Sequence, residues 1–151
     1  MINYKIKKAS VADAAEILKL QHTAYQSEAV LYNDYSIQPL IQTLEELEQE
    51  FNNSVVLKAV SDGGIIGSVR GCVKNGTSHI GKLIVKPECQ NQGVGKALLI
   101  VLESEFQCNR YELFTGHKSV KNLTLYEKLG YRRFKEVDVG NFTMIFMEKT
   151  I

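Results

Sequence analysis

Residues 83–96 read LIVKPECQNQGVGK, and this stretch decides the fold class of the chain. Its apolar start, Leu83–Val85, is typical of a strand, and a helical pattern begins near Gly93. The first amides of a helix lack intrahelical partners and carry partial positive charge. Gly93 and Gly95 have no Cβ atoms, so a phosphate could approach these amides closely. The stretch therefore predicts a pyrophosphate site on the backbone of Gln90–Lys96.

Two better-known glycine loops do not match this stretch. A Walker A loop, G-x-x-x-x-G-K-[ST], needs a hydroxyl residue after its lysine, but Lys96 is followed by Ala97. It also needs a glycine five residues before Gly95, where the chain has Gln90. A dinucleotide fingerprint needs a small residue three positions after its second glycine, where the chain has Leu98. The sequence thus argues against both kinds of nucleotide loop.

Three strand-like runs lead into the loop, namely Ser54–Val60, Ile65–Val73 and Thr77–Val85. The first two are separated by Asp62-Gly63-Gly64 and the last two by Asn75-Gly76. Both separators are hairpin signals, because tight turns need positive φ, which glycine and asparagine tolerate. We therefore expect an antiparallel meander here, not the parallel unit of a dinucleotide fold.

The residues before the meander are predicted to form one strand and two helices. Ile2–Lys8 alternate apolar and polar residues, as a half-buried strand does. Ser10–Asp13 fit a capping box, which opens a helix that should end near Tyr25–Ser27. Glu28–Leu40 show no clean period and predict a loop or a broken helix. Thr43–Glu46 fit a second capping box, which opens a short helix.

The residues after the loop alternate between helix and strand. The pattern predicts a helix over Gly93–Phe106, a strand over Arg110–Thr115, a helix over Ser119–Gly130 and a closing hairpin of Tyr131–Val137 and Asn141–Glu148. The element order is then β-α-α-β-β-β-α-β-α-β-β. This order predicts an α/β (α+β) fold with a mixed, mostly antiparallel central sheet flanked by helices.

Length and composition indicate a single domain over residues 1–151. The chain is 44% hydrophobic and 23% charged, and its net charge of +1 favours binding neither to nucleic acid nor to a membrane. No run has the apolar character of a signal peptide or a membrane helix. Cys72, Cys89 and Cys108 have no C-x-x-C spacing, so we expect neither a disulfide framework nor a metal site. A cytoplasmic location is the simplest expectation.

The loop resembles the acyl-CoA signature of the GNAT superfamily of N-acetyltransferases. That signature is Q/R-x-x-G-x-G/A at a helix start, matched by Gln90–Gly95, after a strand ending L-x-V-x-P, matched by Leu83–Pro87. The resemblance implies the GNAT fold and acetyl-CoA (coenzyme A) as cofactor, with pyrophosphate on the loop amides and the pantetheine arm paired to the strand like an extra strand. The cofactor-binding residues that it implies are Leu83, Ile84, Val85, Gln90, Asn91, Gln92, Gly93, Val94, Gly95, Lys96 and Asn122.

Asn122–Tyr131 resemble the second motif of the family, with Asn122 four residues before Tyr126 on one helix face. The resemblance implies that both side chains meet the cofactor and that Tyr126 protonates the departing thiolate. This chemistry is reasonable, because the ordinary pKa of tyrosine is about 10 and that of a thiol about 8.5. In the alternative interpretation, Tyr126 packs near the helix end and Asn122, three residues after Ser119, caps a helix-start amide.

An amine must be neutral to attack, and His79 is a candidate catalytic base because histidine titrates near neutrality. In a regular strand His79 would share one face with Leu83 and Val85. Gly81, between them, would leave that face open. Alternatively, His79 hydrogen-bonds a neighbour and water accepts the proton.

The acceptor pocket of the resembled family is formed by the first helices and their linker. Here the resemblance implies His22–Leu40, with Tyr25, Glu28, Tyr32 and Asp34 as substrate-binding candidates. Glu28 or Asp34 could hold a cationic amine, and either could instead be a solvated loop charge.

Together these patterns predict an N-acetyltransferase that transfers the acetyl group of acetyl-CoA to an amine of a small molecule or peptide. The amine would attack directly, and backbone amides near Leu83–Val85 would stabilise the tetrahedral intermediate. Two alternatives stay open, which are the same fold with another acyl-CoA and a non-catalytic acyl-CoA-binding module. A homodimer is compatible with the sequence, which fixes no oligomeric state.

Overall fold

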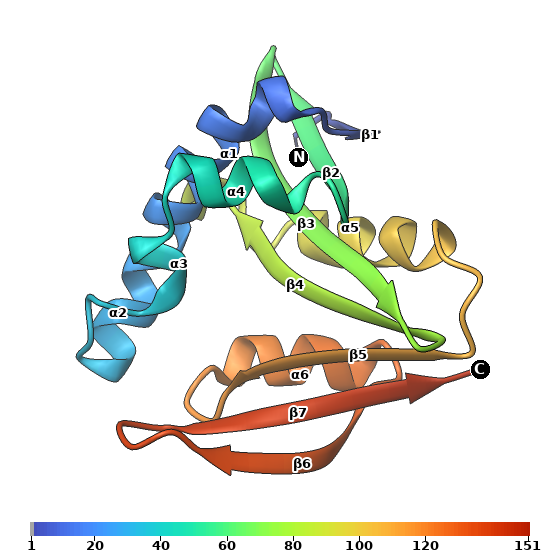
Figure 1. The fold of residues 1–151 in the computed structure, drawn as a ribbon. Coiled ribbons are helices and arrows are strands. Elements are labelled where there is room, and N and C mark those ends of the chain that lie inside the picture. Colours follow the sequence, from blue (N-terminus) through green and yellow to red (C-terminus); the bar gives the residue numbers. More distant parts are fainter. Residues whose placement is uncertain (1) are drawn as a thin grey trace.

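The computed structural model describes residues 2–151 and contains one seven-stranded sheet with helices on both faces (Figure 1). The strands are β1 Lys5–Lys8, β2 Val55–Ser61, β3 Gly64–Lys74, β4 Thr77–Val85, β5 Arg110–Gly116, β6 Arg132–Asp138 and β7 Thr143–Thr150. Their spatial order is β1-β2-β3-β4-β5-β7-β6. Only β4 and β5 are parallel neighbours within the described residues. The predicted mixed, mostly antiparallel sheet is confirmed.

The helices agree with the predicted order. They are α1 Ala14–Ala24, α2 Gln26–Tyr32, α3 Gln38–Ile41, α4 Leu44–Glu50, α5 Val94–Ser104 and α6 Val120–Lys128, with single 3₁₀ turns at Val11–Asp13 and Pro87–Cys89. The irregular region after Tyr25 is a broken helix, because α2 ends at Asn33 with a φ of 51° and α3 follows. The second capping box is confirmed, since Thr43 and Glu46 each accept the other's backbone amide, at 3.2 and 2.8 Å.

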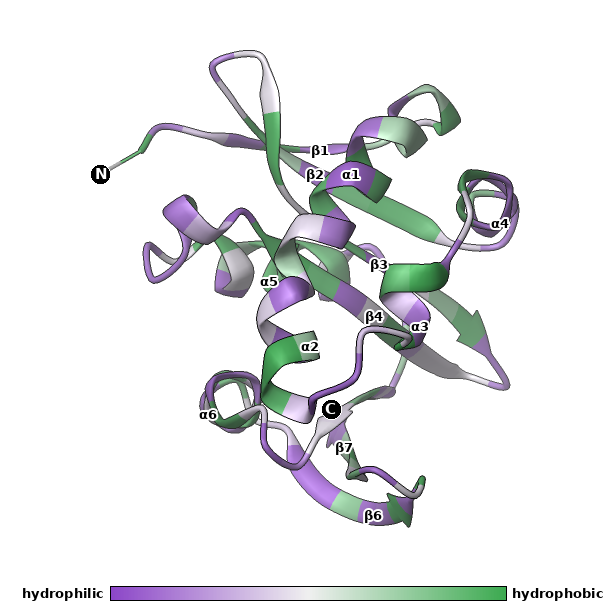
Figure 2. Ribbon diagram, turned by 90° about the vertical axis from the view of Figure 1, so that its left-hand side faces the viewer, coloured by the Kyte–Doolittle hydropathy of each residue, from purple (hydrophilic) through white to green (hydrophobic). Residues whose placement is uncertain are grey.

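The predicted meander is also confirmed, and both of its turns use positive φ. Asp62 and Gly63 have φ values of 50° and 78°, and Asn75 and Gly76 have 51° and 78°. The closing hairpin of β6 and β7 forms as well. All residues of β6 are exposed, and Figure 2 shows this edge strand mostly in the purple of hydrophilic residues.

Helix α5 packs on one face of β2, β3 and β4, whereas α1 and α4 pack on the other (Figure 1). Two glycines of β3 permit the close approach of α5. A Cβ at Gly67 would lie 3.0 Å from Leu98, and one at Gly71 would lie 3.3 Å from Leu102. Leu123 of α6 joins the same apolar cluster as α5. The sheet is therefore the middle layer of three.

Strands β4 and β5 pair over only three residues and then diverge (Figure 1). The paired residues are Thr77–His79 on β4 and Arg110–Glu112 on β5. Beyond them the remaining strand, Gly81–Val85, has β3 as its single strand neighbour. The middle of the sheet is thus open on one side of β4.

A bulge interrupts β4 where this opening begins. Lys82 has a φ of 53°, and the β3–β4 register shifts between Ser68 and Arg70. Gly81 pairs with Arg70, and Ile84 already pairs with Ser68, so β4 has one residue more than β3 over this span. An extra residue reverses the alternation of side chains along the strand.

The bulge separates His79 from the residues that follow it. His79 lies on the face of Arg70, whose guanidinium bonds to α1. Val85 pairs with Gly67, which faces α5, and Leu83 joins the α5 cluster. The prediction placed His79 and Gly81 on the same strand face as Leu83 and Val85. It is therefore wrong, because it assumed a regular strand.

Two further expectations concern membranes and metals. Within residues 2–151, no helix has the length and apolar character needed to cross a membrane. The same part of the chain has no group of three or more His, Cys, Asp or Glu side chains that could hold a metal ion. Cys72, Cys89 and Cys108 are free thiols.

Candidate active site

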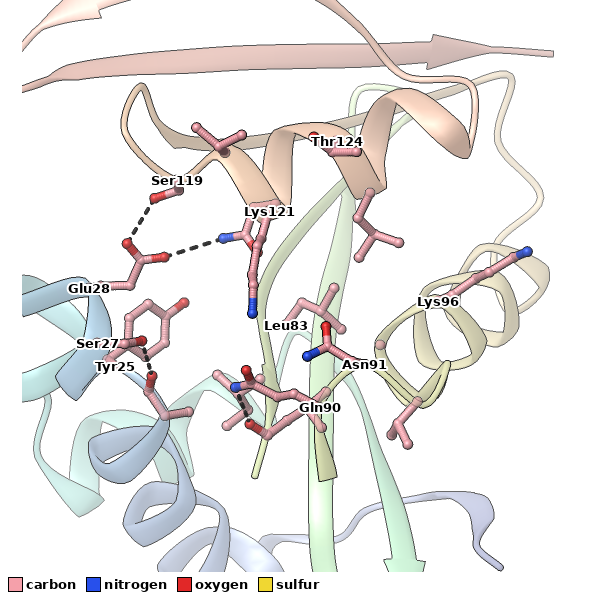
Figure 3. A pocket seen from close by; sticks show the side chains of 18 of the residues that line it. Tyr25, Ser27, Glu28, Leu83, Gln90, Asn91, Lys96, Ser119, Lys121 and Thr124 are labelled. Atoms are coloured by element: carbon pink, nitrogen blue, oxygen red, sulfur yellow. Dashed lines mark hydrogen bonds between the residues drawn. The ribbon is translucent and has the colours of Figure 1, made fainter. Parts of the chain in front are cut away.

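The divergence of β4 from β5 leaves a first cavity of about 790 Å³ (Figure 3). Its walls come from the loop before α5, from α6 and from the first turn of α2. All the implied cofactor-binding residues line it except Gln92. The Gln92 side chain turns away and accepts a hydrogen bond from the Ile2 amide at 3.3 Å.

The loop before α5 presents its backbone to this cavity. Asn91 and Gly93 have φ values of 62° and 85°, and the Gln90 side chain ties the loop to β4 by donating to the Val85 carbonyl at 3.1 Å. The amides of residues 91–96 donate to no acceptor within residues 2–151. A Cβ at Gly93 would meet nothing within 4 Å. Such a row of open amides at a helix start fits an anionic group.

Lysine side chains give the first cavity a positive charge. Lys96, Lys118, Lys121 and Lys128 line it, and none of them forms an ion pair within the described residues. Among the described residues that line this cavity, Glu28 is the single carboxylate. In Figure 3 Lys121 reaches from α6 into the cavity, whereas Lys96 points away from the loop. The α6 lysines were not predicted, although Lys121 and Lys128 lie seven residues apart, which places them on one helix face.

A second cavity, of about 690 Å³, adjoins the first and is lined by the preceding part of β4, His79–Leu83. Five residues line both cavities, namely Tyr25, Glu28, Leu83, Ser119 and Asn122. Tyr32, Asp34, His79 and Tyr126 line the second cavity alone. The structure thus brings every predicted substrate-binding residue to the second cavity, and the two cavities meet at Leu83 and Glu28.

A polar network fixes Glu28 at this junction (Figure 3). Ser119 Oγ donates to one Glu28 oxygen at 2.8 Å, and Asn122 Nδ2 lies 3.4 Å from the other. Tyr32 lies 2.7 Å from Ser119 Oγ, and since that serine proton is used, the Tyr32 hydroxyl donates to Ser119. The Asn122 amide also bonds to Thr115 Oγ1 at 3.3 Å. Asn122 therefore holds Glu28 in place and does not cap a helix-start amide.

Ser119 lines both cavities, although its sequence position indicates only the start of a helix. It occupies the position before α6, but its hydroxyl caps no helix amide and serves Glu28 instead. Only the folded chain brings Ser119 to α2, since the two residues are 91 positions apart.

Tyr126 is buried in α6 with its hydroxyl unpartnered within residues 2–151. Burial raises its pKa well above the usual value, and the nearby Tyr25 and Glu28 raise it further. Burial likewise raises the pKa of Tyr25 to about 12. Both hydroxyls are therefore protonated at neutral pH, and Tyr126 has a proton that no neighbouring group accepts.

His79 stands apart from the junction. It lies where β4 and β5 still pair, four residues before Leu83, and its Nδ1 is 3.7 Å from a Glu112 oxygen. The histidine therefore has a partner of its own at one end of the second cavity. Glu28, in contrast, lines both cavities.

Known proteins resemble this chain in both sequence and fold. The family model described as "Acetyltransferase (GNAT) domain" matches residues 21–151. An uncharacterized N-acetyltransferase of Methanocaldococcus jannaschii is 36% identical over 75 residues, which are 47% of this chain and 48% of that protein. The alignment thus spans about half the length of the curated relative.

Solved structures share the fold at low identity. The PaiA N-acetyltransferase of Thermoplasma acidophilum, in complex with coenzyme A, has a TM-score of 0.82 at 19% identity and covers 99% of this chain and 100% of its own. The ribosomal-protein-S18-alanine N-acetyltransferase of Escherichia coli has a TM-score of 0.82 at 16% identity, covering 99% and 94%. With the family model matching most of its length, the chain belongs to the GNAT acetyltransferase family.

Proposed function

We propose that the chain transfers the acetyl group of acetyl-CoA to an amine of a small molecule or peptide. The observation that carries the proposal is the meeting of two unlike cavities at Leu83 and Glu28. One offers open amides and lysines, and the other offers carboxylates and tyrosines. Two structural neighbours hold the related ligands, coenzyme A in the T. acidophilum protein and acetyl-CoA in a protein from Salmonella typhimurium.

The residues of the first cavity fit coenzyme A. The amides of residues 91–96 would bind the pyrophosphate, and Lys121 and Lys128 would neutralise phosphate charge. The open side of β4, from Gly81 to Val85, would pair with the amides of the pantetheine arm. When bound, acetyl-CoA supplies the acetyl group as an activated thioester.

The residues of the second cavity would bind and deprotonate the acceptor. Glu28 would hold the ammonium form at the junction and accept a proton from it, because an amine attacks only when neutral. Tyr126 would supply a proton to the departing thiolate, since its hydroxyl is protonated and has no competing acceptor. His79 stays a candidate for passing the proton towards solvent, as its side chain is 40% exposed.

A thiol-release assay with acetyl-CoA and a panel of small amines and short peptides tests the proposal. We expect release of coenzyme A that depends on an amine. Binding of coenzyme A without release on any member of the panel would instead favour an acyl-CoA-binding module. The same assay with longer acyl-CoA donors measures the donor preference.

A substitution in the loop links this activity to the first cavity. A Cβ at Gly95 would contact Val85, Leu83 and Leu125 at 3.7 to 3.9 Å, so a side chain fits there without forcing the backbone apart. We expect Gly95→Asp to abolish coenzyme A binding in calorimetry, because it brings a carboxylate to the phosphate site. Gly95→Asn is the matched neutral control and should bind more tightly than Gly95→Asp. Equal affinity of the two variants would argue against phosphate at this loop.

A further inference from the structure

Lys82 occupies the bulge of β4 in a conformation that does not favour lysine. Its φ of 53° lies in the left-handed region, which is unfavourable for residues with a Cβ and easiest for glycine or asparagine. The turn alone therefore gives no reason for a lysine here. Residues in such unfavourable backbone conformations are frequent at binding sites, where the side chain contacts a ligand.

The Lys82 ammonium has no partner within the described residues. It is partly buried in the wall of the second cavity and forms neither an ion pair nor a hydrogen bond there. Burial lowers its pKa, the Arg70 guanidinium lowers it further, and Glu50 opposes the shift. An ammonium taken from water without a partner is unfavourable, so an anion at this point would be bound strongly.

The nearby carboxylate of Glu50 is already in use. Arg70 donates to its two oxygens at 2.8 and 3.3 Å, and Gln42 donates to one of them as well. Arg70 is itself 3% exposed and also bonds to Gln21 and Gln42, at 3.1 and 3.0 Å. This closed set satisfies Arg70 and leaves Lys82 as the unpaired cation of the cavity wall.

The other charged side chains of the second cavity can also be sorted into those that have a partner and those that lack an oppositely charged one. His79 faces Glu112. The Asp34 oxygens accept from Ser36 and Asn141 at 2.7 to 3.2 Å. Within residues 2–151, Glu28 accepts hydrogen bonds only from neutral groups and forms no ion pair. The cavity thus presents Glu28 as a carboxylate for a cation, and Lys82 as an ammonium for an anion.

Much of the rest of the second cavity's wall is apolar. The remaining wall includes Ile37, Leu113, Phe114, Val139, Phe142 and Met144. A cavity of about 690 Å³ is of the size that small organic ligands occupy. A ligand that matches this wall has two opposite charges and an apolar body.

We infer that the acceptor is a small zwitterion of the apolar α-amino acid class, with its amine at Glu28 and its carboxylate at Lys82. This inference rests on the proposed acetyltransferase function. In the reaction the acceptor nitrogen bonds to the acetyl carbonyl carbon and the thioester carbon–sulfur bond breaks. The ammonium nitrogen loses two protons and the sulfur gains one, so the products are an N-acetyl amino acid, coenzyme A and one proton released to solvent.

The test compares acceptors that differ in one charge. Phenylalanine and phenylalaninamide have the same shape, but the amide lacks the carboxylate, and 1,5-diaminopentane presents a second cation instead. With the full chain and acetyl-CoA, we expect kcat/KM for phenylalanine to exceed that for either other amine at least about tenfold, the range of one charge-assisted contact. A wild-type preference for phenylalaninamide or the diamine would overturn the zwitterion while keeping the acetyltransferase.

Variants of Lys82 assign the preference to this residue. Lys82→Asn removes the charge and suits the left-handed backbone, so the fold should persist, as a thermal unfolding curve will show. We expect it to lower kcat/KM for phenylalanine about tenfold more than for phenylalaninamide, mainly through KM, and Lys82→Arg to keep part of the preference. An undiminished preference in Lys82→Asn would overturn the assignment.

A binding measurement separates the two proposals if no acceptor releases coenzyme A. Such inactivity would count against the proposed function. Calorimetry of phenylalanine and phenylalaninamide with protein saturated with coenzyme A then tests the zwitterion site directly. Tighter binding of phenylalanine that is lost in Lys82→Asn supports the site, and equal binding of the two ligands refutes it.

Discussion

Tyr25 lies between α1 and α2, Tyr126 lies on α6, and both line the second cavity. Burial raises the pKa of each hydroxyl, so both stay protonated through the neutral range. Glu28 lies in the same wall and contributes to both shifts. One carboxylate and two protonated hydroxyls thus adjoin the point where the cavities meet.

The Tyr126 hydroxyl is the residue-scale feature that is easiest to test. We expect Tyr126→Phe to lower kcat roughly 100-fold, the size of one general-acid contribution, and to change the Kd for coenzyme A less than about twofold. Steady-state kinetics and calorimetry measure the two quantities. Tyr131→Phe is a suitable control, because the Tyr131 hydroxyl donates to Glu103 at 2.6 Å away from both cavities. A normal kcat in Tyr126→Phe would make Tyr126 a packing residue.

At the scale of elements, α6 serves both cavities. Its buried side places Tyr126 in the second cavity, and its lysines Lys121 and Lys128 line the first. Ser119 and Asn122, at its start, hold Glu28 of α2. The helix therefore couples the position of the acidic group to the cationic wall.

The α6 lysines should contribute to coenzyme A affinity in a salt-dependent way. We expect Lys121→Ala and Lys128→Ala each to weaken binding about threefold to tenfold at low ionic strength, and less at high salt, because exposed charges are screened. Lys74→Ala removes an exposed lysine at the β3–β4 turn and is the control. Calorimetry at two salt concentrations measures the effect. An unchanged affinity for coenzyme A in both variants would mean that the loop amides alone bind the phosphates.

The order of the elements could be predicted from the sequence, and their register could not. Alternation, capping boxes and glycine turns are local signals, and they predicted the strands and most of the helices. The bulge at Lys82 has no such signal, because it is defined by the pairing of β4 with β3. The error over the strand face of His79 follows from that one residue.

The same limit applies to the site. The loop of Gln90–Lys96 is continuous in sequence, so the open amides at the start of a helix could be predicted, whereas the turning away of the Gln92 side chain could not. The binding of a phosphate there stays a prediction. The contacts of Glu28 with Ser119, and the lack of a partner for Lys82, depend on tertiary packing. A linear pattern carries no information about which charges neutralise one another.

At the scale of the whole molecule, buried tyrosines couple stability to alkaline pH. The pKa of Tyr25 is raised to about 12, and those of Tyr126 and Tyr131 are raised as well, in each case first of all by burial. Glu103, which accepts a hydrogen bond from the Tyr131 hydroxyl, raises the pKa of Tyr131 further. These tyrosines ionise near pH 10 in the unfolded chain, so above that pH the folded state binds more protons than the unfolded one.

The contribution of these tyrosines to the free energy of unfolding should therefore be constant below about pH 10. It should fall as the pH rises towards 12. The expected slope is about 1.4 kcal/mol per pH unit for each tyrosine that is ionised only when unfolded. Urea unfolding between pH 8 and pH 11.5 measures it. Tyr131→Phe should reduce the slope by about one tyrosine, and an unchanged slope would contradict the buried assignment.

The whole fold is shared with proteins that are only 16 to 19% identical. The proposed donor site helps to explain this, because it consists of backbone amides, two glycines and an open strand, which many sequences can supply. The wall proposed for the acceptor is built from side chains such as Glu28, Lys82 and Phe142. Divergence of such residues would change the acceptor without disturbing the proposed donor site.

The opening between β4 and β5 gives the sheet an edge inside the molecule. The unpaired backbone groups of an edge strand can form hydrogen bonds with a strand of another chain, which is a common route to aggregation. Of the two outer edges, β1 and β6, the second has Arg132, Arg133 and Lys135 along it, charges that discourage such addition. The inner edge on β4 lines the first cavity, whose wall also includes residues of α5 and α6. Because this unpaired edge of β4 lies in the wall of a cavity, it is less accessible to a strand of another copy of the protein than an outer edge is.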